Sequence, residues 1–491
     1  MSKDDLKRKT VNGFFWGTIE RVLSQGQGMI YGIILARLLS PKEFGVVGMV
    51  TIFISIAQVF VDSGLSQALI RKQNCTNTDY STVFWSNIGI GFFFYIVIWF
   101  ISPMIASFYE KPELVSLTRV IALAIIIGSL TLIQQTILTK EIDFKTLTKI
   151  STLGTLVSGV ISIIMAFSGW GVWSLVWRSI IDKTIRSILL WFHNRWVPEQ
   201  NFSIRSFKEL FSFGSNILFI SLIAAVAKNI YNLVIGKSYS AVVLGYYTNA
   251  DQYSGIPSTT LASVTNSVSF PVLASIQDDN TKLKASCGKL NNTIMFVSFF
   301  CMFGLAAIAK SLFSALFGEK WLPAVVFFQI LCLAYAASPL HTINQNIMKV
   351  KGRSDLFLRT EIIKYILFVP IVILGIIYGL SILIWGIALF YWLSFLVNGM
   401  YTHKLINYSL FEQVKDISLL FVLSASLALF VWSMEFWLHI KPFFLLAAQS
   451  ASYIVLIISV SYIFKLSAFF EMKELFFRKL SYIGINNKSI S

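Results

Sequence analysis

The sequence predicts an all-α polytopic membrane protein with about 14 transmembrane helices, and three observations support this class. Hydrophobic residues make up 56% of the 491 residues and charged residues only 13%, against about 45–50% and about 25% in soluble domains. The mean hydropathy is +0.72. Apolar runs recur from one end of the chain to the other. In a soluble fold this composition would expose very large apolar patches, which argues against a soluble enzyme, a disordered chain and a nucleic-acid-binding domain.

Each apolar run has at least about 20 residues, the length that an α-helix needs to cross about 30 Å of hydrocarbon. Short glycine-containing breaks, Gly169 to Gly171 and Gly379, separate two pairs of runs. Pro257, Pro339 and Pro370 fall inside runs, where proline either bends a helix or is simply tolerated. The expected spans cover residues 12–38, 43–67, 82–109, 114–138, 147–169, 171–193, 207–236, 241–273, 289–317, 321–349, 357–378, 381–403, 416–437 and 442–464.

Lysine and arginine are distributed unevenly between alternate connections of these spans. One set of connections, together with both ends of the chain, holds 26 of them, and the other set holds five: Lys42, Lys111, Lys237, Lys320 and Lys441. Cytoplasmic connections carry an excess of basic residues, so this pattern places both termini in the cytoplasm and requires an even number of helices. We therefore interpret the net charge of +16 as charge at the membrane surface rather than as a nucleic-acid-binding surface.

A short internal repeat with an offset of 200 residues indicates two similar halves. Residues 33–37 (IILAR) align without a gap with residues 233–237 (LVIGK), and Gly45 aligns with Gly245. Repeated halves that rock around a central site are a common plan of secondary transporters. We therefore predict two six-helix lobes around a central cavity. The predicted parts are an N-terminal lobe (1–200), a C-terminal lobe (201–406), two additional helices (407–465) and a cytoplasmic tail (466–491).

Polar and charged side chains inside the expected spans are candidates for contact with a substrate, because burying them in a bilayer is costly. Arg21 lies about 13 Å along the first helix from Asn12 at about 1.5 Å per residue, near the middle of the bilayer. It would either meet an anionic substrate or pair with an acid from another helix. Lys228 complements it in the second half, unless its side chain snorkels outward. The substrate-binding candidates are Arg21, Lys228, Glu20, Gln25, Asn232 and Asn249.

Two isolated acids are candidates for coupling to an ion. Asp62 and Asp251 have no charged neighbour in sequence inside their spans. Either of them would pair with Arg21 or Lys228, or would bind a coupling cation.

The sixth span carries a row of charges that we interpret as structural. Arg178, Asp182 and Arg186 follow one another at four-residue steps, with Lys183 adjacent. Residues four apart share a helix face, so we expect Arg178 to pair with Asp182 and Arg186 to reach the cytoplasmic headgroups.

Motifs of enzymes and of metal or cofactor sites are absent from the sequence. The chain has no Gly-x-Ser-x-Gly, HExxH, P-loop or dinucleotide-binding glycine pattern in a suitable context. Its four histidines are scattered, and its four cysteines show no CxxC spacing. We expect no catalytic residues, no metal site and no cofactor, and cysteines that serve as packing residues without disulfides. The expected connections are too short for a soluble catalytic domain.

Four segments of the sequence are characteristic: residues 35–45 (LARLLSPKEFG), 62–71 (DSGLSQALIR), 244–250 (LGYYTNA) and 269–275 (SFPVLAS). They resemble bacterial polysaccharide exporters, the Wzx-like lipid-linked oligosaccharide flippases, which share a superfamily with lipid II flippases and multidrug-and-toxin extruders. The resemblance implies an undecaprenyl-diphosphate-linked oligosaccharide as substrate, alternating access and a bacterial cytoplasmic (inner) membrane location. It also implies membrane lipids and assembly proteins such as a polysaccharide polymerase as partners, and a cationic cavity that Arg21 and Lys228 would match by position.

Two other functions remain open at this point. A cation-coupled multidrug extruder would favour buried acids over buried bases. A membrane-embedded polysaccharide polymerase or ligase would be expected to carry a sizeable outer loop with catalytic charges, and the sequence offers none.

The charge distribution predicts the topology. Reporter fusions near Lys145, Lys284 and Arg353 should report the cytoplasm, and fusions near Lys111 and Lys320 should report the opposite side. A reversed or non-alternating pattern would contradict the assignment of basic connections to the cytoplasm.

Overall fold

The computed structural model describes residues 3–474, without the side chains of residues 3–15, Thr18 and Arg21. All regular secondary structure in these residues is helical, with no β-strand, which confirms the all-α class. The chain divides into two compact units, Met1–Thr248 and Asn249–Ser491, each described below by itself. The lobe boundaries expected at residues 200 and 406 stay predictions.

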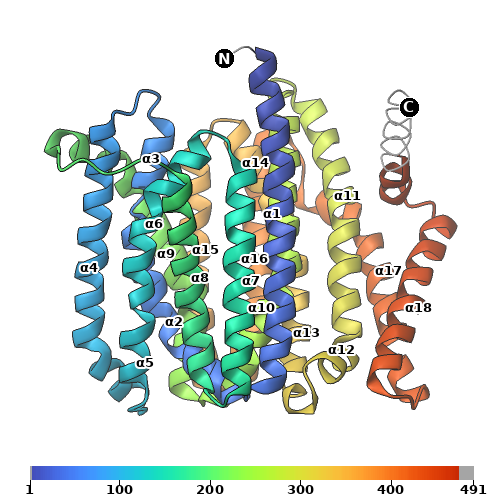
Figure 1. The fold of residues 1–491 in the computed structure, drawn as a ribbon. Helices are drawn as coiled ribbons and strands as arrows, with labels where there is room; N and C mark the ends of the chain where they lie inside the picture. Colours follow the sequence, from blue (N-terminus) through green and yellow to red (C-terminus); the bar gives the residue numbers. More distant parts are fainter. Residues whose placement is uncertain (1–2, 475–491) are drawn as a thin grey trace, which may run out of the picture. The chain divides into compact units, whose positions relative to one another are not determined.

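The first unit contains nine helices among the described residues and the start of a tenth. Figure 1 shows α4, α6, α8, α7 and α1 side by side with nearly parallel axes, and each packs on the next in this order. Helix α9 belongs to this unit because it packs on α2 and α3. The helices are α1 (Lys3–Leu38), α2 (Pro41–Asp62), α3 (Leu65–Arg71), α4 (Asn77–Phe108), α5 (Leu114–Ile121), α6 (Leu123–Lys140), α7 (Phe144–Phe167), α8 (Val172–His193), α9 (Ile204–Ser238) and α10 (Ala241–Ala274), which continues into the second unit.

The second unit is built around a cluster of aromatic side chains. The ring centroid of Phe421 lies 5.5 Å from that of Phe299 and 5.9 Å from that of Trp392. Helix α17, expected as part of an added pair, therefore contributes directly to the core of this unit. Its helices are α11 (Asn280–Ala307), α12 (Ala309–Leu316), α13 (Ala324–Ala336), α14 (Ser338–Val350), α15 (Ser354–Tyr378), α16 (Leu380–Ile406), α17 (Leu410–Trp437) and α18 (Pro442–Ile463), with a 3₁₀ turn at Glu319–Trp321.

Eleven stretches of the described chain are long and apolar enough to cross a membrane. The other three of the fourteen expected spans fall on α1, α8 and α10, which are helices of 36, 22 and 34 residues. At about 1.5 Å per residue each is long enough to cross the hydrocarbon. Their polar and charged residues lower their hydropathy, so the exact number of spans stays a prediction.

Several expected spans are interrupted helices. Ser63 and Gly64 adopt positive φ values of 36° and 66° between α2 and α3, where glycine is favoured because it has no Cβ. Span ten breaks at Ala337, just before Pro339. Helices α10 and α15 continue through Pro257 and Pro370. All four cysteines are free thiols, as expected.

Two glycines that the repeat aligns allow the beginnings of α2 and α10 to cross at backbone contact. A Cβ atom on Gly45 would lie 1.6 Å from the carbonyl oxygen of Ala241, and one on Gly245 would lie 1.8 Å from that of Pro41. The two contacts are equivalent under the offset of 200 residues, because Pro41 corresponds to Ala241. A side chain at either position would force the helices apart.

The variant Gly45→Ala should therefore destabilise the protein by about 1–3 kcal/mol, as overpacking of a close contact does. Gly89→Ala is the matched control in α4, because its added methyl group meets nothing within 4 Å. The measurement is the thermal midpoint of unfolding of the purified protein in detergent. Equal midpoints for the two variants would contradict the close crossing.

Candidate functional site

A polar cavity of about 800 Å³ lies within the first unit. Residues of α2, α3, α6, α8 and α9 and of the α2–α3 break line it. Amides, hydroxyls and charged groups predominate among them, which is unusual for a space between membrane helices. The lining comprises Gln58, Val59, Asp62, Gly64, Ser66, Gln67, Ile70, Gly128, Thr131, Leu132, Gln135, Thr136, Thr139, Asp182, Lys183, Arg186, Ile217, Leu218 and Ser221.

Lys183 connects α8 to α2 and α6 through a short hydrogen-bond chain. Its Nζ donates to Gln58 Oε1 at 2.9 Å and to the carbonyl oxygen of Ala124 at 3.2 Å. Gln58 Nε2 in turn donates to Asp62 Oδ1 at 3.3 Å. The Gln58 amide thus links an ammonium group to a carboxylate that is exposed to the cavity.

Arg186 forms the second charged contact of the cavity. Its Nε lies 2.9 Å from Asp182 Oδ2, and its Nη2 donates to Thr155 Oγ1 at 2.9 Å. Both members of the ion pair are about 30% exposed. The Nε–H and Asp182 Oδ1 have no aligned hydrogen-bond partner among the described residues. The guanidinium therefore keeps donor capacity for a ligand.

Two glycines make room for these charged pairs. A Cβ atom on Gly128 of α6 would lie 3.3 Å from Gln58 Oε1 and 3.5 Å from Lys183 Nζ. One on Gly154 of α7 would lie 2.8 Å from Arg186 Cγ. Glycine lets helices approach closely in membranes, and here it lets long polar side chains lie between them.

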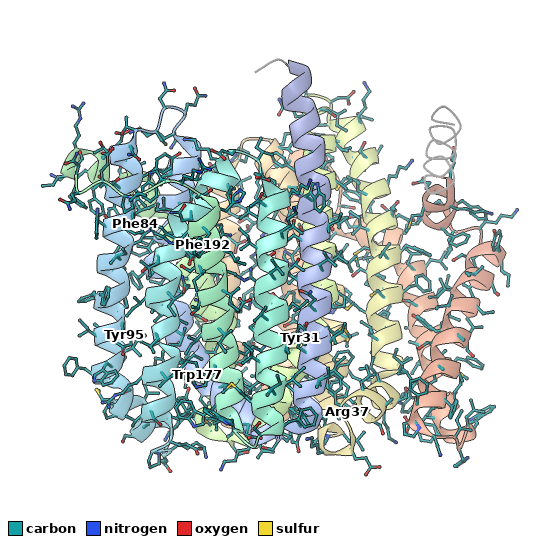
Figure 2. All side chains as sticks on the ribbon, in the orientation of Figure 1. Tyr31, Arg37, Phe84, Tyr95, Trp177 and Phe192 are labelled. Atoms are coloured by element: carbon teal, nitrogen blue, oxygen red, sulfur yellow. The ribbon has the colours of Figure 1, made fainter. Side chains whose placement is uncertain are left out.

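The structure corrects the expectation for the charge row of α8. Asp182 pairs with Arg186 rather than with Arg178, whose guanidinium lies 6.0 Å from the ring centroid of Tyr31. Tyr31 is labelled in Figure 2 and packs against Gly159 of α7. Arg186 Nη2 is hydrogen-bonded to Thr155 of α7, and its reach to the headgroups stays a prediction. Spacing along α8 offers Asp182 two equivalent arginines, and only the neighbouring helices select one of them.

Asp62 is the one sequence-derived candidate that lines this cavity. Lys228 is exposed on α9, and Asn232 donates to Asn229 Oδ1 at 3.4 Å. Glu20 and Gln25 lie on α1, and the side chain of Arg21 lies outside the described residues.

Two further candidates lie in α10, within the second unit. Asn249 is buried, and neither of its amide atoms has a partner among the described residues. Asp251 accepts a hydrogen bond from the hydroxyl of Tyr335. Their roles stay predictions.

Lys183, Arg186 and Gln58 were not predicted as site residues. The signal of Lys183 and Arg186 in the sequence is the charge of α8, which is why α8 is not among the eleven apolar stretches. Gln58 lies on α2, where a single amide gives no comparable signal. The cavity holds two cations and two carboxylates, so its formal charge is balanced when all four are ionised. Hydroxyls and amides complement sugar hydroxyls, and the planar guanidinium complements phosphate. The described residues contain no group of three or more His, Cys, Asp or Glu side chains that would hold a metal ion.

The described helices form a bundle with a polar, charged cavity among them, and solved structures with the same fold are named as membrane transporters. The fold matches that of "Lipid II flippase MurJ, inward closed conformation" with a TM-score of 0.73, over 92% of this chain and 98% of that one, at 15% identity. It matches an inward-facing multidrug resistance MATE family transporter of the MOP superfamily with a TM-score of 0.60, over 79% and 96%, at 16% identity.

The chain belongs to the family described as polysaccharide biosynthesis proteins, whose model matches residues 34–326. It is 30% identical to the teichuronic acid biosynthesis protein TuaB of Bacillus subtilis (strain 168), over 61% of this chain and 62% of TuaB. It is 25% identical to the lipopolysaccharide biosynthesis protein WzxC of Escherichia coli (strain K12), over 75% of this chain and 76% of WzxC. The resemblance to polysaccharide exporters is thereby confirmed.

The amide bridge between Lys183 and Asp62 should contribute to stability. In Gln58→Leu the ammonium loses an acceptor and the carboxylate loses a donor, so the free energy of unfolding should fall by about 1–3 kcal/mol. Gln67→Leu removes an exposed amide from the same cavity and should change it by less than about 0.5 kcal/mol. Unfolding in detergent measures both, and equal effects would contradict the bridge.

Proposed function

We propose that this protein moves an undecaprenyl-diphosphate-linked oligosaccharide across the bacterial cytoplasmic membrane for the synthesis of a surface polysaccharide. The single observation that carries the proposal is the family match over residues 34–326. Relatives are named for teichuronic acid and lipopolysaccharide biosynthesis, and one is named "Succinoglycan biosynthesis transport protein ExoT". The glycan itself differs among these names, so the proposal is limited to the shared class of lipid-linked glycan.

The chemistry of the cavity supports this substrate. A diphosphate and a sugar chain lose their hydration on entering hydrocarbon, and that loss is prohibitive without replacement contacts. Lys183 and Arg186 replace hydration of the anionic groups, and Gln58, Gln67 and Gln135 replace hydration of sugar hydroxyls. The protein then needs no reaction of its own, because crossing the membrane makes and breaks no covalent bond.

Transport proceeds by alternating access of two six-helix lobes, with both termini in the cytoplasm. The repeat-related contacts of Gly45 with Ala241 and of Gly245 with Pro41 support a two-fold relation between the halves. Arg21 and Lys228 remain proposed substrate contacts on the first and seventh spans. Uphill movement draws on an ion gradient, the membrane potential or consumption of the product, and Asp62 and Asp251 are the proposed coupling acids.

A cation-coupled multidrug exporter is the second candidate, because the cavity also contains two carboxylates, Asp62 and Asp182. Each of them already faces a cation of the protein, Lys183 through Gln58 and Arg186 directly. A cationic drug would therefore compete with these cations and would meet like charge. An anion would likewise compete with the two carboxylates, so it is the family match, and not the charge of the cavity, that favours the oligosaccharide.

Deletion of the gene should stop surface polysaccharide synthesis and cause a lipid-linked intermediate to accumulate on the cytoplasmic side. The wild-type gene should restore export. Lys183→Gln and Arg186→Gln should each reduce export at least about tenfold, since a hydrogen bond to a charged group contributes about 1.5–3 kcal/mol. Lys42→Gln is the control, because Lys42 is exposed and outside the cavity. Normal polysaccharide with increased drug sensitivity after deletion would instead identify a multidrug exporter.

A further inference from the structure

A second group of charged side chains lies within the second unit, where α14 and α15 form a helical hairpin. His341, Gln345 and Lys349 follow one another at four-residue steps of α14 and therefore share a face of that helix. Glu361 and Lys364 of α15 complete the group. Gln345 Nε2 donates to Glu361 Oε1 at 2.6 Å, and Lys364 Nζ donates to the same oxygen at 2.5 Å. The Glu361–Lys364 pair lies about two turns inside α15, which begins at Ser354.

This cluster has more positive than negative charge. Lys349 lies one helical turn beyond Gln345 on the same face of α14, and Gln345 donates to Glu361, so the group contains two ammonium groups and one carboxylate. The side chain of Lys364 is only 8% exposed. The excess charge is carried by the exposed Lys349, so a ligand anion can approach it beside the buried Lys364–Glu361 pair.

The cluster also contains an unused polar atom. His341 lies one helical turn before Gln345 on the same face of α14. Its Nδ1 is buried without a hydrogen-bond partner among the described residues. A buried polar atom without a partner costs about 1–3 kcal/mol, and an Nδ1–H would donate to an anion bound beside Lys364.

The cluster is accessible, and its accessible side is not the lipid-facing side of α15. Lys349 is exposed, and His341, Gln345 and Glu361 are half-buried. The exposed apolar residues Ile362 and Ile366 mark the lipid-facing stripe of α15. Lys364 is two residues from each of them, which is about 200° around the helix at 3.6 residues per turn. Lys364 therefore lies on nearly the opposite side of α15 from this stripe.

We propose that Lys349 and Lys364, with Gln345 and His341, form an oxyanion-binding site for the transported glycolipid, in which Glu361 holds Lys364 until the anion binds. This inference rests on the proposed function. It adds that the second unit recognises the substrate through an acidic group of the substrate. The oxyanion is a phosphate of the lipid carrier or a carboxylate of an acidic sugar. One excess positive charge matches a singly charged carboxylate, which would leave the occupied site neutral.

The test is the binding of three probes to the full-length protein in nanodiscs of uncharged lipid. Tetragalacturonate offers sugar carboxylates, farnesyl diphosphate offers the phosphates of a prenyl carrier, and maltotetraose is the uncharged sugar control. Lys349→Gln should weaken binding of an oxyanion probe about tenfold. Glu361→Gln should tighten it, because the internal competitor is lost. Lys404→Gln removes an exposed lysine of α16 away from the cluster and should change nothing.

The opposite signs expected for the two variants separate an anion site from a structural ion pair. A loss confined to tetragalacturonate assigns the site to a sugar carboxylate, and a loss confined to farnesyl diphosphate assigns it to the lipid carrier. Both results support the site. Unchanged affinity for both anions in Lys349→Gln, or equal weakening in Glu361→Gln, overturns it. Unchanged elution and thermal midpoint without ligand show that each variant is folded.

Failure of this inference is distinguishable from failure of the proposed function. Accumulation of the lipid-linked intermediate after gene deletion tests the function without reference to Lys349 or Glu361. If the deletion strain accumulates the lipid-linked intermediate but the variants bind both anions normally, the anion site alone is rejected. If the deletion strain does not accumulate the intermediate, the flippase proposal is rejected, whatever the probes show.

Discussion

Charged side chains that helices carry into a bilayer must find their partners within the protein, because hydrocarbon offers neither hydrogen bonds nor hydration. The first unit meets this constraint through α8. Lys183 finds acceptors on α2 and α6, and Arg186 finds Asp182 and Thr155. These contacts require the helices to approach closely, which Gly128 and Gly154 permit. The cavity lies where these polar side chains do not fill the space between the helices.

The charge balance of that cavity suits transport better than tight binding. An anion that approaches Lys183 or Arg186 competes with Asp62 or Asp182. These carboxylates already neutralise part of the positive charge, so they weaken the electrostatic attraction of the anion. A carrier has to release its substrate, and internal carboxylates lower the affinity without removing the cations that recognise it. Glu361 stands in the same relation to Lys364 in the second unit. Both units thus pair a cation with an acid of their own.

The secondary structure was largely predictable, because hydrophobic length and helix breakers act locally. The break after Phe167 and the end of α15 at Gly379 lie where glycines interrupt apolar runs. The break at Ser63 and Gly64 was not predicted, although Gly64 is visible in the sequence. Gly64 both adopts a positive φ and packs closely against Gly214 of α9, where a Cβ on Gly64 would lie 2.4 Å from the carbonyl oxygen. Such an approach depends on a segment about 150 residues away, which no local pattern reveals.

For the candidate site, the types of side chain could be predicted from the sequence, but the pairs that they form could not. The sequence alone determined a helical membrane protein with polar groups at membrane depth, because composition and hydropathy depend on residue type and not on neighbours. It also determined Asp62 as an unusual acid and the aligned glycines Gly45 and Gly245. The tertiary structure decided which charges meet. Asp182 sits one turn from both Arg178 and Arg186, and it pairs with Arg186 because Gly154 and Thr155 of α7 leave room and a hydrogen bond there. Lys183 points toward Gln58 for the corresponding reason, since partners on other helices exist only once the helices have packed.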